Sequence, residues 1–379
     1  ADEAMLEAVA KGLGITVDQA AERVAQQEEN IARGRKIGAS LRGRSGGFYL
    51  DEGGQLVVTT IDTVGDAEVR KDRGRPQRVE YTAGRLNAVV KQLERHVRRH
   101  GGGALHGMYI DVPGNTVVIE VDEGAEDPAT AALLDIAGRF GTAVRVDHVD
   151  EVRRPATMGD WSIGGLGYDV DRTYNGYAND CSIGFNAVTS TGYPVMITAG
   201  HCVDRKVGQW ASRNGYWFGR VRSDHFPGDD FGTIWNEGSS HFTPSPDVYT
   251  WYGNRSVNMP AYAYLPVRGY TNNHVPGSIM CKSGITTGFT CGIIKSSYQT
   301  VLSDGGLVYG LVRHNACAQK GDSGGANITP SGLALGVTST GSLDRWGRCL
   351  AYQGFENVAY YQPIGEVLQR EGLRLLIAN

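Results

Sequence analysis

Several features that assign a protein to a broad class are scarce or missing in this chain of 379 residues. No apolar run approaches the roughly 18 residues that a membrane-spanning helix needs, so we expect no membrane partner. Lysine and arginine number 37 against 41 acidic residues, and without a basic excess we expect no nucleic acid partner. Cys-x-x-Cys pairs are absent, which argues against a zinc site. Asp169, Asp171 and Asp180 fit acids of surface turns better than a calcium site, so we expect no metal ion. The first residues lack the basic start and apolar core of a secretory signal, so the sequence itself predicts none, and a signal removed beforehand stays an alternative.

Cysteine and tryptophan are also missing from the first 158 residues, and this asymmetry divides the chain. All six cysteines and all six tryptophans lie beyond residue 160. Charged residues number 46 among the first 158 residues but only 32 among the other 221. The total length suits two domains. We therefore predict one domain over residues 1–158 and a second, cysteine-bearing domain over residues 159–379.

The first part has the alternating pattern of an α+β domain. Thr16-Val17-Asp18-Gln19 has the form of a capping box, which predicts a helix reaching about Ile37. Apolar periodicity predicts a helix over 82–100, and its basic run from Lys91 to His100 fits a solvated helix face better than a nucleic-acid patch. Further patterns predict hairpins joining 48–50 to 56–58 and 108–110 to 117–119, a helix near 128–139 and a strand near 143–149.

The second part has the pattern of an all-β domain. Short apolar or aromatic runs alternate with clusters of glycine, asparagine, serine and aspartate, as in a barrel or a sandwich. A single helix is predicted near the end, over 364–371.

Two motifs in the second part carry chemistry. In Gly321-Asp322-Ser323-Gly324-Gly325, the glycines let the backbone turn sharply around a serine and aim amide groups at one point. In Thr198-Ala199-Gly200-His201-Cys202, a histidine follows an apolar strand. Either motif alone is more often structural. Together, in the order histidine then serine, they resemble the chymotrypsin-like serine proteases, and most of all the secreted bacterial branch of α-lytic protease and the streptogrisins.

The resemblance implies where the third catalytic residue lies. That branch carries its acid after the histidine in a Pro-Gly-Asn-Asp setting, and the matching stretch here is Pro227-Gly228-Asp229-Asp230. Asp230 takes the catalytic position, and Asp229 stands where the family has asparagine. Asp229, Asp224 and Asp204 remain alternatives, because all three are acids near the expected position.

Roles for the site residues follow from the same resemblance. Ser323 would attack the peptide carbonyl, His201 would carry the proton, and Asp230 would orient the histidine. The amides of Gly321 and Ser323 would form the oxyanion hole. Ser339 would hydrogen-bond the acid from behind, with a plain strand serine as the alternative. No cofactor is expected.

Six cysteines predict three disulfides and an oxidising compartment, and spacing alone leaves many pairings open. The resemblance implies these pairs: Cys181–Cys202, Cys281–Cys291 and Cys317–Cys349. It also implies that buried Asp322 needs a cation. Where the family has arginine after the cysteine, this chain has Lys282, in a stretch similar to the family's Cys-Arg-Ser-Gly-x-Thr-Thr-Gly. Lysine offers a point charge instead of a two-pronged fork.

Pocket residues implied by the resemblance predict the substrate preference. Relatives that cut after lysine or arginine carry an aspartate where this chain has Cys317, and relatives that cut after glutamate carry a histidine in place of Thr338. An uncharged pocket favours large apolar or aromatic P1 side chains. Lys320 replaces the proline common in streptogrisins and would attract an acidic side chain at a flanking subsite, unless it is a solvated surface lysine. The candidate pocket residues are Ala318, Lys320, Thr338, Thr340 and Gly341.

The first domain resembles the pro-region of this family, which acts as a folding catalyst and then as an inhibitor. The expected architecture is therefore an α+β pro-domain followed by an all-β double-barrel trypsin-like protease domain. We expect a secreted, monomeric, self-processing zymogen that acts on protein or peptide substrates and binds its own pro-region. Cleavage should fall within 153–163, after Met158 or Trp161. The alternatives are a glutamyl-specific protease and a catalytically silent binding protein on the same fold.

Overall fold

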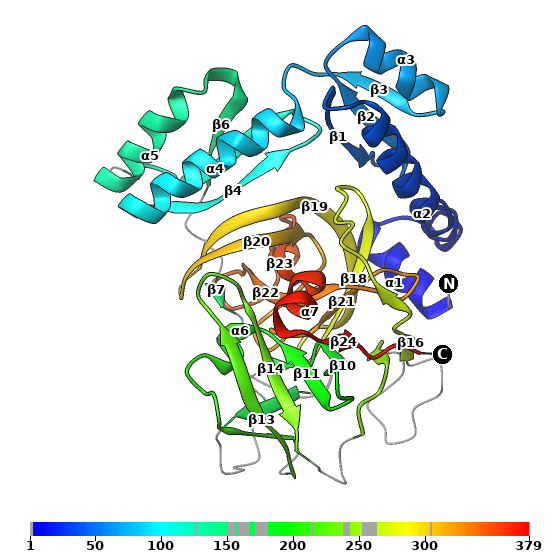
Figure 1. Ribbon diagram of the computed structural model, residues 1–379, viewed down its shortest axis with the longest axis vertical. Helices are drawn as coiled ribbons and strands as arrows, with labels where there is room; N and C mark the ends of the chain where they lie inside the picture. Colours follow the sequence, from blue (N-terminus) through cyan, green and yellow to red (C-terminus); the bar gives the residue numbers. More distant parts are fainter. Residues whose placement is uncertain are drawn as a thin grey trace.

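The N-terminal part of the chain is a series of helices and small sheets along one side of the molecule (Figure 1). The computed structural model describes residues 3–125, 127–149, 156–157, 167–170, 181–213, 216–237, 243–251, 264–303 and 305–378. The N-terminal elements are α1 (Glu3–Leu13), α2 (Val17–Ser40), β1 (Ser45–Leu50), β2 (Leu56–Thr60), α3 (Thr63–Lys71), β3 (Arg75–Arg78), α4 (Ala83–His100), β4 (Leu105–Asp111), β5 (Thr116–Asp122), α5 (Pro128–Gly138), η1 (Gly141–Ala143) and β6 (Val144–Val149).

Side-chain caps determine where several of these helices begin. The Thr16 hydroxyl accepts the amide of Gln19, and the Gln19 side chain accepts the amide of Thr16, so the predicted capping box is present. Asp62 and Asp127 cap α3 and α5. The sequence patterns do not predict α1, α3 or β3. The helix α3 has only nine residues, and too few of them are buried for a clear apolar periodicity.

The first barrel is an eight-stranded sheet with the order β24-β10-β11-β14-β13-β12-β8-β9. Its elements are β8 (Gly167–Val170), β9 (Cys181–Ser182), β10 (Phe185–Val188), β11 (Pro194–Thr198), the short helix α6 (Gly200–Val203), β12 (Trp210–Arg213), β13 (Tyr216–His225), β14 (Phe231–Asn236) and β24 (Arg374–Leu375). In Figure 1 this barrel lies at the end of the molecule away from the N-terminal helices.

The second barrel contains six strands in the order β18-β21-β22-β23-β20-β19. Its elements are β18 (Ile279–Gly284), β19 (Gly288–Ser303), β20 (Gly306–His314), β21 (Ala326–Ile328), β22 (Leu333–Ser342), η4 (Leu350–Gln353), β23 (Val358–Pro363) and α7 (Ile364–Glu371). Between the barrels the chain forms β15 (Asp247–Tyr249), β16 (Tyr264–Pro266) and β17 (Gly269–Tyr270). The helix predicted over 364–371 is present, and the all-β expectation for this part is confirmed.

One buried cluster joins the two barrels. Phe185, Ile197 and Phe231 from the first barrel pack with Val337 from the second and with Ile364 from α7. Both Ile197 and Phe231 lie close to the motif residues in sequence, so the apolar packing between the barrels places the two chemical motifs at the same junction.

The sheet of the second barrel continues into the N-terminal part. Strand β4 pairs antiparallel with β19, with Met108 facing Thr300, and β5 and β6 extend the sheet beyond it. A second contact lies on β18, which pairs directly with β19, and there the side-chain amide of Gln27 in α2 donates to the Ile279 carbonyl and accepts the Ile279 amide. The N-terminal part therefore holds the second barrel at two neighbouring strands, β19 and β18 (Figure 1).

One further strand bears on the site. β7 (Ala156–Thr157) pairs antiparallel with β22. The predicted cleavage candidates Met158 and Trp161, and with them the predicted boundary at 158, lie outside the described residues. None of the helices in the described ranges is both long and apolar enough to cross a membrane.

Candidate active site

Three side chains predicted to act together meet at the junction of the barrels. His201 lies in α6 directly after β11, Asp230 lies in the turn before β14, and Ser323 lies in the turn before β21. The His201 Nδ1 atom is 2.9 Å from Asp230 Oδ2, and its Nε2 atom is 2.8 Å from Ser323 Oγ. The imidazole thus bridges the carboxylate and the hydroxyl, which is the geometry of a base that can take the serine proton.

Asp230 is held in its ionised form by its neighbours. It is 1% exposed, and burial alone would raise its pKa, but the ring and amide of His201 and the hydroxyl of Ser339 together keep the pKa below the ordinary value. Ser339 donates to Asp230 Oδ2 over 2.5 Å, and the His201 amide donates to Oδ1 over 2.9 Å. A carboxylate with these partners favours the Nδ1–H tautomer of the imidazole.

The alternative acids are engaged elsewhere. Asp229 forms an ion pair with Arg370 of α7. Asp224 accepts the backbone amide of Arg205, and Asp204 lies 3.7 Å from the Arg205 guanidinium. Of the four candidates, the structure brings Asp230 to the histidine ring.

The turn around Ser323 depends on its glycines and on one unpredicted serine. Gly321 has φ 95° and Gly324 has φ 81°, a region that favours glycine. A Cβ on Gly324 would also clash with Thr198 Oγ1. The Ser182 hydroxyl donates to the Gly321 carbonyl over 2.8 Å and accepts the Ile285 amide over 3.0 Å. These contacts hold the Gly321–Asp322 peptide, which lies between the two amides that the sequence assigns to the oxyanion hole.

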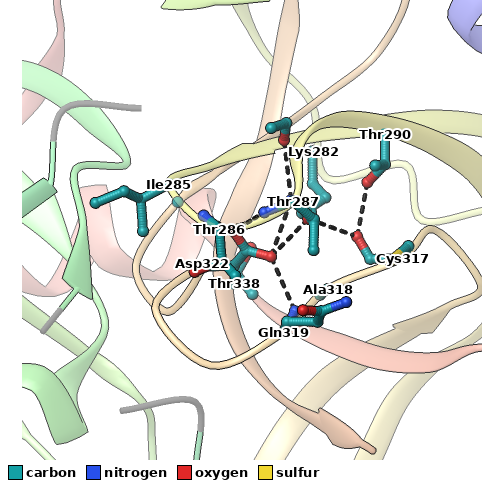
Figure 2. Close-up of polar contacts among 12 residues, drawn as sticks. Lys282, Ile285, Thr286, Thr287, Thr290, Cys317, Ala318, Gln319, Asp322 and Thr338 are labelled. Carbon is teal, nitrogen blue, oxygen red and sulfur yellow. Dashed lines mark hydrogen bonds and ion pairs between the residues drawn. The ribbon is translucent and has the colours of Figure 1, made fainter. Parts of the chain in front are cut away.

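Asp322, beside the reactive serine, lies in a fully buried polar cage (Figure 2). Its Oδ1 atom accepts the amides of Thr286 and Thr287, and its Oδ2 atom accepts the Thr287 hydroxyl and the Gln319 amide. Lys282 Nζ lies 3.2 Å from Oδ2 and donates to the Gly288 carbonyl over 3.0 Å. The lysine therefore reaches the carboxylate despite replacing the family's arginine.

Burial of this pair has an electrostatic cost. Desolvation lowers the pKa of Lys282 below its ordinary value, although Asp322 opposes the change. The threonines of the Ser-Gly-Ile-Thr-Thr stretch and the Gln319 amide supply the remaining donors, so the carboxylate is satisfied without a forked cation.

The disulfides in the structure are Cys181–Cys202, Cys281–Cys291 and Cys317–Cys349, the pairs that the resemblance implies. The sulfurs of Cys181 and Cys202 lie near His201 and form the single cluster of potential metal ligands found among the described residues. The two sulfurs are bonded to each other and both ring nitrogens of His201 are hydrogen-bonded, so this cluster does not fit a metal ion.

The candidate pocket residues surround the end of β22. Ala318, Thr338, Thr340 and Gly341 are buried, and Lys320 is exposed with its carbonyl accepting the Thr286 hydroxyl. Ala318 packs with Ala359 and Leu343, which the sequence did not single out. The Thr338 hydroxyl accepts the Asn327 amide over 2.9 Å. The buried members carry no charge, and Thr340 and Gly341 face Thr157 and Ala156 of β7.

The residues that the sequence did not predict share one property. Ser182 and Gln362 both act on the site through contacts with positions more than 130 residues away. Gln362 Oε1 accepts the Asp230 amide over 2.9 Å. Gln362 lies in no glycine-rich or cysteine-bearing motif, and Ser182 follows Cys181 without a motif of its own, so no local pattern indicates either role.

Comparisons with known proteins match both parts of the chain. Family models described as Alpha-lytic protease pro N-terminal, Alpha-lytic protease prodomain and Trypsin match residues 18–79, 81–141 and 188–364. Streptogrisin-C of Streptomyces griseus is 31% identical over 377 residues, which cover 99% of this chain and 75% of that protein. Serine protease 1 of Streptomyces fradiae is 31% identical and covered to 83%, over 87% of this chain. The crystal structure of Thermobifida fusca Protease A is 34% identical, with a TM-score of 0.45 over 57% of this chain and 98% of that one.

Proposed function

Because the chain belongs to the streptogrisin and α-lytic protease family of serine proteases and carries the prodomain of that family, we propose that it is a secreted, self-processing zymogen whose peptidase works through Ser323, His201 and Asp230. The observation that carries the proposal is the 2.8 Å approach of His201 Nε2 to Ser323 Oγ, with Asp230 on the other ring nitrogen. Secretion is supported by three disulfides, which persist in oxidising compartments.

The proposed reaction is acyl transfer to the serine and then to water. His201 takes the proton of Ser323 as the hydroxyl oxygen attacks the peptide carbonyl, and it returns that proton to the leaving amine. Asp230 stabilises the imidazolium without taking its proton. The amides of Gly321 and Ser323 stabilise the oxyanion of the tetrahedral intermediate. Water then attacks the acyl-enzyme while His201 takes its proton. His201 returns that proton to Ser323 as the carboxylic acid product leaves.

Residues 1–158 act in this proposal as the inhibitor of their own protease. The pairing of β7 with β22 supports this role, because Ala156 and Thr157 occupy the strand edge that a substrate backbone would use. The β4–β19 pairing and the Arg313–Glu120 ion pair, 2.9 Å long and largely buried, add affinity away from the cleft.

The register of β7 favours one of the two cleavage candidates. Ala156 faces Gly341 and Thr157 faces Thr340, which directly follows Ser339 on β22. Ser339 borders the triad through its bond to Asp230. We therefore favour cleavage after Met158 over cleavage after Trp161, and a domain boundary between residues 158 and 159.

A preference for apolar P1 side chains follows from the pocket. Ala318, Ala359 and Leu343 form an apolar wall, and Thr338 stands where glutamate-cutting relatives carry histidine. The glutamyl-specific alternative has no cation among the buried candidate pocket residues to support it. The silent-fold alternative is opposed by the intact arrangement of His201, Asp230 and Ser323.

A fluorophosphonate probe and a P1 peptide library test the proposal on the matured protein. We expect one adduct per chain, at Ser323, and faster hydrolysis after methionine, leucine or phenylalanine than after glutamate or lysine. The His201→Ala variant should lose the adduct. Absence of an adduct in matured wild type would support the catalytically silent binding protein. Fastest cleavage after glutamate would support the glutamyl-specific protease.

A further inference from the structure

The C-terminal helix α7 contacts the segment that carries Asp230 at several points. Arg370 pairs with Asp229, and Glu371 Oε1 lies 2.7 Å from His225 Nε2. Both contacts come from the last turn of the helix and reach residues within five positions of Asp230.

Gln362 links the helix to the backbone of Asp230 itself. It lies on β23 just before α7 and is fully buried. Its Oε1 atom accepts the Asp230 amide over 2.9 Å, and its Nε2 atom donates to Glu366 Oε2 over 2.8 Å. Because the nitrogen end of the amide can only donate, the contact with Glu366 determines which end faces Asp230.

The close approach of β22 and β23 fixes the position of Gln362. Val337 faces it across the ladder, and a Cβ on Gly336 would clash with the Gln362 carbonyl. The side chain therefore has a rigid base on one strand and a partner on one helix. A side chain held in this way can determine where a neighbouring loop sits.

We propose that Gln362 is a positioning residue for the reaction, and that it works with Glu366 and Arg370 as a clamp that sets the Asp230 carboxylate against His201. The carboxylate is held at its oxygens by Ser339 and by the His201 amide, and the clamp holds its backbone from the other side. The inference rests on the proposed catalytic role of Asp230. Small displacements of an orienting group are costly in rate, because the reaction needs aligned partners.

The charges around the clamp are those of Glu366, Asp229, Arg370, Glu371 and His225. Burial and the neighbouring Asp229 raise the pKa of Glu366, while its contacts with Gln362 and Arg370 oppose the rise. The hydrogen bond from Gln362 survives in either protonation state, because a neutral carboxyl still accepts at one oxygen.

The test compares three variants of the full chain after maturation, with trace wild-type protease added if self-cleavage is slow. Gln362→Met removes both hydrogen bonds at similar volume. The exchange Gln362→Glu with Glu366→Gln retains an acceptor for the Asp230 amide and a donor between the two side chains. Gln299→Met is the matched control, because Gln299 is equally buried but bonds to Ser296.

We expect Gln362→Met to lower kcat by roughly ten- to a hundredfold with little change in KM. It should also shift the low-field proton resonance of the His201–Asp230 hydrogen bond and the acid limb of the kcat/KM profile. The exchanged pair should recover kcat to within about threefold of wild type. Gln299→Met should affect stability alone.

A Gln362→Met protein that is less stable but keeps wild-type kcat, resonance and acid limb would overturn the clamp. If that variant does not fold, Glu366→Leu provides the test, because it removes the hydrogen-bond partner of Gln362 from a half-buried position on the helix. An unchanged kcat and an unchanged resonance in Glu366→Leu would again overturn the proposal. The Asp230→Asn variant distinguishes a failure of the proposed triad from a failure of the clamp. Unchanged kcat in that variant would refute the triad itself, whereas a loss there beside a normal Gln362→Met would refute the clamp alone.

Discussion

Lys282 Nζ lies 3.2 Å from Asp322 Oδ2, and both side chains are completely excluded from solvent. Replacing the lysine by methionine would leave a buried carboxylate without its countercharge. We expect Lys282→Met to lower the free energy of unfolding by about 3–5 kcal/mol and to abolish most activity, because Asp322 adjoins Ser323. Denaturant unfolding and kcat measure the two effects.

Two companion variants separate charge from packing at this pair. Lys282→Met with Asp322→Asn removes both charges, so it should recover part of the lost stability. Lys282→Arg keeps the charge and should stay close to wild type. Equal stability of Lys282→Met and wild type would show that the ion pair makes no net contribution to the free energy of unfolding.

Asp230→Asn tests the orienting acid. The amide cannot stabilise the imidazolium or the required tautomer, so we expect kcat to fall by about 10⁴-fold, the size of this effect in the general serine-protease template. Ser339→Ala removes one of the contacts that lower the pKa of Asp230 and should have a smaller effect. Asp224→Asn is the matched control and should be near wild type. A large loss in the control with normal Asp230→Asn activity would reassign the acid.

The Arg313–Glu120 ion pair tests how the N-terminal domain holds the protease. Both side chains are only 14% exposed, so Arg313→Met leaves Glu120 without its partner in the interface. Breaking such a pair costs roughly 2–5 kcal/mol, so the cleaved complex should dissociate at least about thirtyfold more readily. Activity across a dilution series of the cleaved protein gives this dissociation constant. Lys295→Met, which breaks an ion pair within the second barrel, should leave the constant unchanged.

Buried His314 should make the folded protein sensitive to acid. Burial and the nearby Lys282 lower its pKa to about 3, whereas an unfolded histidine titrates near 6.5. Between these values the unfolded state binds the extra proton, so stability falls as the pH drops from about 6.5 toward 3, by on the order of 5 kcal/mol in total. His314→Phe should reduce this dependence in denaturant unfolding at pH 7 and pH 4.5, and His274, whose pKa burial lowers to about 4, should retain part of it. An equally steep loss in that variant would assign the acid sensitivity to other groups.

The reactive motifs could be predicted because their geometry depends on residues that are neighbours in the sequence. Gly321 and Gly324 take backbone angles that favour glycine, so the turn around Ser323 leaves a local signature. The same holds for the capping box of Thr16 and Gln19, whose partners are three residues apart. Hydrogen-bond partners that lie a few residues apart can therefore be predicted from their spacing alone.

The remaining parts of the site depend on long-range register. Ser182 reaches Gly321 across 139 positions, and Gln362 reaches Asp230 across 132. Each is an ordinary polar residue in a strand, and only the packing of the two barrels gives it a role. Ala156 and Thr157 likewise bear on the site only through their pairing with β22, and no spacing in the sequence predicts that pairing.

The central claim is that this chain cuts itself with Ser323, and intact-mass measurement of purified wild type and Ser323→Ala tests it most directly. The account predicts that wild type separates into two chains divided between residues 158 and 159, with the fluorophosphonate adduct on the C-terminal chain. Ser323→Ala should stay at full mass without an adduct. Efficient cleavage of the purified Ser323→Ala protein at the same bond would contradict the claim.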